Sequence, residues 1–109
     1  MDYASGLAGG TLDFYEQYRA MKKAWTKGVD PFFHCMANCL AWRRGSGGQD
    51  AAEVLSEGRE RFDEYVKGDP RSVCDADRAA NRQGRDPAFP EDADCVERCS
   101  SLAPPWFRP

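Results

Sequence analysis

The stretch that decides the fold is DPFFHCMANCLAW, residues 30–42. Asp30 followed by Pro31 is a strong helix start, because aspartate caps the first turn and proline suits the first helical position. The residues that follow are apolar on most sides and carry few charges. Such a segment is typical of a helix buried on most sides. We therefore predict a helix that ends at Trp42 and packs against more than one neighbour.

Cysteines four residues apart occur twice, as Cys35 with Cys39 and as Cys95 with Cys99. Positions i and i+4 share one helix face, so two antiparallel helices would be joined by the disulfides Cys35–Cys99 and Cys39–Cys95. We choose this connectivity because a short chain that returns on itself usually packs antiparallel. A zinc site with four thiolate ligands and reduced core thiols are the alternatives. Cys74 is left over and is expected to be a buried thiol.

Helical periodicity extends through most of the chain, and no convincing strand is present. Beside the helix over 30–42, we predict helices over about 11–27, 49–67, 71–83 and 91–101. The last residues are rich in proline. The predicted fold is therefore all-α, a four-helix bundle with a short extra C-terminal helix and a wrapping Pro-rich tail joined by disulfides.

Two glycine-rich stretches interrupt this pattern. Residues 1–10 (MDYASGLAGG) are expected to be a flexible linker, so that residues 11–109 form a single helical domain. The GSGG stretch at 45–48 is expected to be a short flexible connection, and no Lys-Ser/Thr follows it as in a phosphate-binding loop.

The helix over 49–67 is expected to pack through an apolar face and to carry ion pairs on the opposite side. The ion pairs are Glu57–Arg61 and Asp63–Lys67, each at i,i+4 spacing. Gly58 is expected to mark a close approach of another helix. The predicted inner face consists of Ala51, Ala52, Leu55, Phe62, Tyr65 and Val66.

Size and charge exclude several classes of protein. The chain has 109 residues, 30% of them charged, and a mean hydropathy of -0.71, which fits one globular domain. We find no membrane-spanning segment and no signal peptide. The net charge is -3 and the pI is about 5.1, so we expect no nucleic-acid partner.

The helix over 11–27 carries an aromatic stripe beside lysines, which is typical of a helix that lies at a lipid interface. An ordinary core face would explain the same stripe. The candidates for lipid contact are Phe14, Tyr15, Tyr18, Met21, Lys22, Lys23, Trp25 and Lys27.

The sequence offers little for catalysis. His34 is the single histidine and a weak catalytic candidate, because its neighbour Cys35 is more simply explained as half of a disulfide. Pairs of acidic residues are common, but such runs usually face solvent. A metal site of His34, Asp75 and Asp77 has no support in the sequence. We expect neither a metal nor a cofactor.

A set of short motifs occurs in a fixed order along the chain. The motifs are YRAM (18–21), DPFFH (30–34), RG (44–45) with GG (47–48), AA (51–52), SEGRE (56–60) and DRAANRQGRDP (77–87). Together they resemble the serum amyloid A family from about Phe14 to the C-terminus. This resemblance implies a four-helix bundle whose C-terminal tail wraps the helices. It also implies binding of lipids, lipoprotein surfaces and retinol through apolar helix faces, often as oligomers, as in animal members of that family.

Three features depart from the animal pattern: Pro31 replaces a lysine, Ser46 replaces a proline, and the cysteine pairs are extra. The HCMANC motif at 34–39 resembles bacterial relatives at the C-termini of Rhs-type polymorphic toxins. The resemblance implies a secreted toxin effector used in interbacterial competition by type VI secretion. It implies an upstream Rhs carrier and a cognate immunity protein.

Such an effector is expected to act without enzymatic activity on the membrane or envelope of the cell into which it is delivered. The periplasm or membrane is then favoured over the cytoplasm, membrane lipid is a candidate partner, and a homo-oligomer is possible. A toxin enzyme with a hidden site, acting in the recipient cytoplasm, and a lipid- or apolar-ligand-binding module are the alternatives.

Overall fold

The computed structural model describes residues 2–24, 29–68, 71–85 and 94–107. These residues form five α-helices and one 3-10 helix, with no strand among them. The all-helical class predicted from the sequence is confirmed for this part of the chain. The helices are α1 (Tyr3–Ala24), α2 (Asp30–Trp42), α3 (Ser46–Tyr65), α4 (Arg71–Gly84) and α5 (Cys95–Cys99), followed by the 3-10 helix η1 (Ser100–Leu102).

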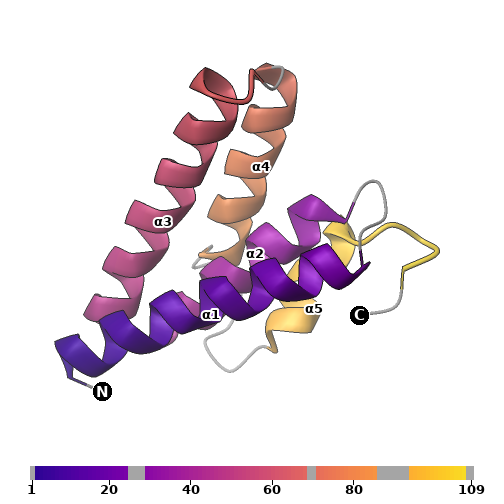
Figure 1. The fold of residues 1–109 in the computed structure, drawn as a ribbon. Coiled ribbons are helices and arrows are strands. Elements are labelled where there is room, and N and C mark those ends of the chain that lie inside the picture. The colour runs from indigo at the N-terminus through magenta and orange to yellow at the C-terminus, as the bar shows by residue number, and fades with distance from the viewer. Residues whose placement is uncertain (1, 25–28, 69–70, 86–93, 108–109) are drawn as a thin grey trace.

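Helix α2 lies in the centre and contacts α1, α3, α4 and α5. Helices α3 and α4 stand side by side as a hairpin, and α1 crosses its open end (Figure 1). Phe32 and Phe33 of α2 pack edge-to-face with each other and with Phe107, at ring-centroid distances of 5.3 to 5.7 Å. The prediction of a helix buried on most sides is therefore correct. Its first residue is Asp30, and Val29 occupies the N-cap position expected for Asp30.

Two disulfides fasten α5 to α2. Cys35 is bonded to Cys99 and Cys39 to Cys95, with Cα–Cα distances of 5.7 and 5.8 Å. This is the connectivity that the antiparallel arrangement of two i,i+4 pairs predicts. Cys74 lies outside both bridges and is buried. The disulfides leave none of the four paired sulfurs available as a zinc thiolate.

Helix α1 begins at Tyr3, so the prediction that a helix starts at Thr11 after a flexible stretch is wrong. The glycines of this stretch form a packing surface. A Cβ at Gly6 would lie 2.9 Å from the carbonyl oxygen of Arg44, and one at Gly10 would lie 3.0 Å from Cα of Gly48. Glycine allows α1 to approach the start of α3 more closely than any other residue would.

The GSGG stretch belongs to α3, which begins at Ser46 and not near Gln49. Gly47 and Gly48 are buried against α1 and α2. Within this stretch Gly45 alone has a positive φ, of 85°, and it forms the turn that the stretch was expected to supply. The remaining glycines are needed for close packing and not for flexibility.

The predicted inner face of α3 is correct only in its first half. Ala51 and Ala52 are buried, but Phe62, Tyr65 and Val66 are 50%, 77% and 69% exposed. The last turns of α3 extend away from α1 beside α4 (Figure 1). The residues that α3 buries in its second half are polar, among them Ser56, Glu60 and Asp63.

Gly58 does not mark a close approach, because a Cβ there would meet no heavy atom within 4 Å. The predicted ion pairs of α3 are present, with Glu57–Arg61 at 3.5 Å and Asp63–Lys67 at 3.6 Å.

The C-terminal part is described from residue 94 to residue 107. Asp94 caps α5 by accepting a hydrogen bond from the backbone N–H of Val96. The predicted start of this helix at residue 91 and most of the preceding Pro-rich stretch lie outside the described residues. Among the described helices, none has the length and apolar character needed to cross a membrane.

The glycines of α3 provide a matched test of this packing. Gly48→Ala places a methyl group against the carbonyl oxygen of Ala41 and should destabilise the protein by about 1–3 kcal/mol. Gly58→Ala in the same helix should stabilise it by about 0.5–1 kcal/mol, since its methyl group meets nothing. Urea denaturation of both variants measures the difference. Equal effects would contradict the close contact at Gly48.

The two disulfides should not contribute additively. Removing one bridge by a Cys39→Ser, Cys95→Ser pair leaves Cys35–Cys99 in place, and the lost bridge then closes a loop of only about eight residues. The chain-entropy model gives a loss of about 2.5 kcal/mol for that pair and about 7 kcal/mol for removal of both bridges. Denaturation of the two variants under non-reducing conditions measures these losses. Equal losses would show that one bridge supplies the whole constraint.

Candidate functional site

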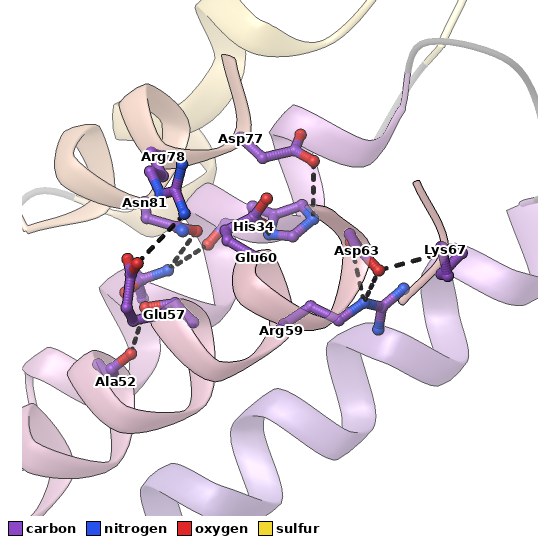
Figure 2. A network of polar contacts seen from close by, with 12 residues as sticks. His34, Ala52, Glu57, Arg59, Glu60, Asp63, Lys67, Asp77, Arg78 and Asn81 are labelled. Carbon is purple, nitrogen blue, oxygen red and sulfur yellow. Dashed lines mark hydrogen bonds and ion pairs between the residues drawn. The ribbon is translucent and has the colours of Figure 1, made fainter. Parts of the chain in front are cut away.

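A buried polar cluster lies where α2, α3 and α4 meet. It consists of His34 of α2, Glu60 of α3 and Asp77 of α4 (Figure 2). His34 Nδ1 is 3.6 Å from Glu60 Oε1, and His34 Nε2 is 3.8 Å from Asp77 Oδ2. One ligand atom from each residue can be chosen so that all three lie within 4.8 Å of one another. The cluster thus brings one imidazole and two carboxyl groups together in the protein interior.

Helix periodicity places these side chains on inward faces. Glu60 follows Ser56 at i+4 on α3, and Ser56 in turn donates a hydrogen bond to the carbonyl oxygen of Ala52. Asn81 follows Asp77 by one turn of α4. Its side-chain oxygen accepts a hydrogen bond of 2.9 Å from Asn38 of α2. A layer of polar groups therefore separates α2 from the α3–α4 hairpin.

Glu60 is the most unusual member of the cluster. Its side chain is fully buried, and neither carboxyl oxygen has a hydrogen-bond partner among the described residues. Burial raises its pKa from the ordinary value of 4.5 to about 8, and the charges of Asp77 and Asp63 add to this shift. Arg78 and Arg59 oppose it. At neutral pH the Glu60 carboxyl is therefore mostly protonated.

His34 has the opposite response to burial. Desolvation lowers its pKa below the ordinary 6.5, and Arg59 adds to this, whereas Asp30, Asp63 and a hydrogen bond to Asn81 act against it. The imidazole is therefore neutral at pH 7. A neutral imidazole keeps one ring nitrogen with a lone pair, which can accept a hydrogen bond or bind a metal.

Two arginines flank the cluster with ion pairs. Arg59 contacts both carboxylate oxygens of Asp63 at 3.2 Å. Arg78 of α4 contacts Glu57 and Glu64 of α3 at 3.2 and 3.3 Å. The Arg78 pairs hold the two helices of the hairpin together, whereas the Arg59–Asp63 pair lies within α3 (Figure 2).

An apolar cavity of about 310 Å³ lies on the other side of His34, between α1, α2 and α3. Aromatic and aliphatic side chains make up most of its wall. His34 and Arg59 are its basic members, so the imidazole faces both the cavity and the polar cluster. The lining residues are Thr11, Phe14, Tyr15, Gln17, Tyr18, Met21, Phe33, His34, Ala37, Leu55, Ser56 and Arg59.

Four of the candidates for lipid contact line this cavity: Phe14, Tyr15, Tyr18 and Met21. Lys22 and Lys23 are exposed on the surface of α1 and do not line it. Trp25 and Lys27 lie outside the described residues. The structure thus brings the aromatic part of the predicted stripe to a cavity.

Sequence analysis did not identify Glu60 as a site residue, and its prediction for the acidic residues near Glu60 was only partly correct. Asp77 is buried, contrary to the expectation that the acidic pairs face solvent, whereas the Asp75 side chain is 61% exposed and lies 3.8 Å from Arg78. A signal for Glu60 does exist. It shares one helix stripe with Ala52 and Ser56, both small residues suited to a buried position.

His34 is not part of a Cys–His catalytic pair. Cys35 is bonded to Cys99, so it supplies no thiolate nucleophile.

The family model described as "Serum amyloid A protein" matches residues 1–109. This chain belongs to the serum amyloid A family. It is 41% identical over 83 residues to the serum amyloid A protein of Anas platyrhynchos, a match that covers 76% of this chain and 65% of that protein. It is 43% identical over 77 residues to serum amyloid A-1 protein of Mus musculus, covering 70% of this chain and 62% of that protein.

The serum amyloid A protein of Equus caballus is 37% identical over 97 residues, and the match covers 80% of this chain and 88% of the horse protein. The matches thus span somewhat less than two thirds of the duck and mouse proteins and most of the horse protein.

These comparisons overturn the assignment to an Rhs-type polymorphic toxin. The relatives named above are serum amyloid A proteins of a bird and two mammals, and nothing connects this chain with the bacterial domains. The predictions of a toxin effector, type VI secretion, interbacterial competition, an Rhs carrier and an immunity protein are wrong. Delivery into a target cell has no support either. The cysteine pairs misled the prediction, because disulfides reflect the redox compartment of a protein and do not identify its family.

The raised pKa of Glu60 predicts a pH-dependent effect of Glu60→Gln. A folded-state pKa near 8, above the ordinary 4.5, means that the proton stabilises the fold fully below about pH 4.5. This stability is lost as the pH rises through 8. Glutamine cannot ionise, so the variant should melt several degrees above the parent at about pH 9. At about pH 5 the two should melt nearly together.

Thermal melts in buffer with a chelator measure this difference. Glu53→Gln, at an exposed position of the same helix, is the control for the loss of a carboxyl group from α3. A constant difference between Glu60→Gln and the parent at all pH values would contradict the raised pKa.

Proposed function

We propose that this protein binds a small apolar molecule, of the size of a retinoid or a single acyl chain, in the cavity between α1, α2 and α3. The observation that carries the proposal is the lining of that cavity. Phe14, Tyr18, Met21, Phe33 and Leu55 converge on it from three helices. Its volume of about 310 Å³ lies at the lower end of the range typical of ligand sites, roughly 300–1,000 Å³.

The polar groups of the cavity suit a ligand with one polar end. Ser56, His34 and Arg59 lie on its α2–α3 side. The Arg59 guanidinium also lies 4.9 Å from the ring centroid of Tyr18, which lines the cavity as well. A hydroxyl or carboxyl group of the ligand would find donors there while its hydrocarbon part contacts α1.

The family membership supports this assignment through the properties expected of serum amyloid A proteins, which include binding of lipids and retinol through apolar helix faces. We also infer that α1 to α4 form the four-helix bundle of that family and that the C-terminal segment covers it. The contact of Phe107 with Phe32 and Phe33 supports this cover. Two disulfides favour a secreted protein, because an oxidising compartment preserves them.

Fluorescence titration with retinol and with a fatty acid tests the proposal. The parent should bind one molecule per chain with a saturable signal. Leu55→Gln places an amide in the cavity wall and should weaken binding by about tenfold or more, since it leaves a polar group against the ligand.

Val54→Gln is the matched control. Val54 precedes Leu55 on α3, is 70% exposed and does not line the cavity. Its affinity should equal that of the parent. Equal losses in both variants, or no saturable binding of either ligand, would contradict binding in this cavity. Circular dichroism of each variant shows that the helices are retained.

A further inference from the structure

We propose that His34, Glu60 and Asp77 bind a divalent transition-metal cation, with Zn²⁺ as the natural candidate. The three side chains come from α2, α3 and α4 and converge in the interior (Figure 2). This site is separate from the binding of an apolar ligand, although His34 borders both.

The donor set is suited to such a cation. One imidazole nitrogen and two carboxylate oxygens are ligands typical of Zn²⁺ with an open fourth position. Mg²⁺ and Ca²⁺ prefer oxygen ligands alone, so the histidine favours a transition metal. The cation would displace the proton that Glu60 holds at neutral pH, and the two carboxylates would then balance its charge.

The buried Glu60 side chain points to a ligand independently of the grouping. A fully buried carboxyl group normally has hydrogen-bond partners, since leaving one unsatisfied costs free energy. Glu60 is 0% exposed, and neither oxygen has such a partner among the described residues. Its Oε1 lies 3.6 Å from His34 Nδ1, and Asp77 Oδ2 lies 3.8 Å from the other ring nitrogen, Nε2. A cation between these groups would satisfy the carboxylate.

The distances allow the site to close around a cation with side-chain movements. Ligand atoms about 2.1 Å from a tetrahedral Zn²⁺ are about 3.4 Å apart. Here the three ligand atoms lie within 4.8 Å of one another, and the two carboxyl groups, which lie nearest different ring nitrogens, would have to rotate toward the same one. His34 also borders the cavity between α1, α2 and α3.

The acidic residues next to the cluster do not compete for the cation, because arginines pair with them. Asp63 and Glu64 are engaged by Arg59 and Arg78 respectively. The cation would therefore meet the two carboxyl groups of the cluster and not a larger pool of acidic residues. Asp75, two residues from Asp77, is exposed and belongs to the surface.

Calorimetric titration of the oxidised, chelator-treated chain with ZnCl₂ tests the site. We expect one Zn²⁺ per chain, and Mg²⁺ should not compete. Glu60→Gln and Asp77→Asn should each weaken Zn²⁺ binding by at least about tenfold. Asp75→Asn, an exposed neighbour on α4, should leave the affinity unchanged.

His34 provides a second readout because it is the only histidine of the chain. In protein without a histidine tag, Zn²⁺ should shift the imidazole resonances of the parent and not those of Glu60→Gln. This distinguishes loss of a ligand from unfolding, since Glu60→Gln is expected to keep or gain stability.

Several results would overturn the metal site. They are absence of Zn²⁺ binding, equal Zn²⁺ affinity in the parent and Glu60→Gln, unchanged His34 resonances, and competition by Mg²⁺. Loss of binding only in Cys74→Ser would also overturn it, because the Cys74 thiol would then be the ligand. Failure of retinol or fatty acid to bind would count against the apolar ligand alone, because the metal titration uses no apolar ligand.

Discussion

The enclosure of α2 by its neighbours is the constraint on which the rest of the structure depends. One side of the helix is bonded through Cys35 and Cys39 to α5. Other sides pack against α1, α3 and α4. A helix bonded in this way cannot rotate about its axis without straining both bridges. The orientation of Phe33 and His34 toward the surrounding helices follows from that restriction.

The surroundings of α2 differ sharply in polarity. Phe32, Phe33 and Phe107 form an apolar cluster near the C-terminal segment. The α3–α4 hairpin instead presents Glu60 and Asp77 to α2. Burying a carboxyl group costs free energy unless it is paired, protonated or bound to a metal. The apolar and disulfide contacts therefore stabilise a fold that also contains an unfavourable polar layer, and such a layer is the place where a functional group is expected.

Close packing explains why the glycine-rich stretches were misjudged. Glycine is common in flexible segments and also where two backbones approach closely, and composition does not separate the two cases. Gly6 and Gly10 became a packing surface because Gly47 and Gly48 lie opposite them. Gly58 was wrongly expected to mark a close approach of another helix, whereas no heavy atom lies within 4 Å of a Cβ placed there. In both cases the deciding fact is the position of another helix, which no local pattern contains.

Local spacing and motif order were sufficient to predict the all-helical class, the buried helix over 30–42 and the family, and they favoured the cysteine pairing that the structure contains. Helix formation and i,i+4 geometry are local properties, and the sequence records them directly. Only the tertiary structure decided which side chains surround His34. Glu60 and Asp77 come from two other helices, and their burial depends on how the α3–α4 hairpin is set against α2. The cavity was equally invisible in the sequence, because the aromatic residues of α1 enclose a volume only when α2 and α3 supply the remaining walls.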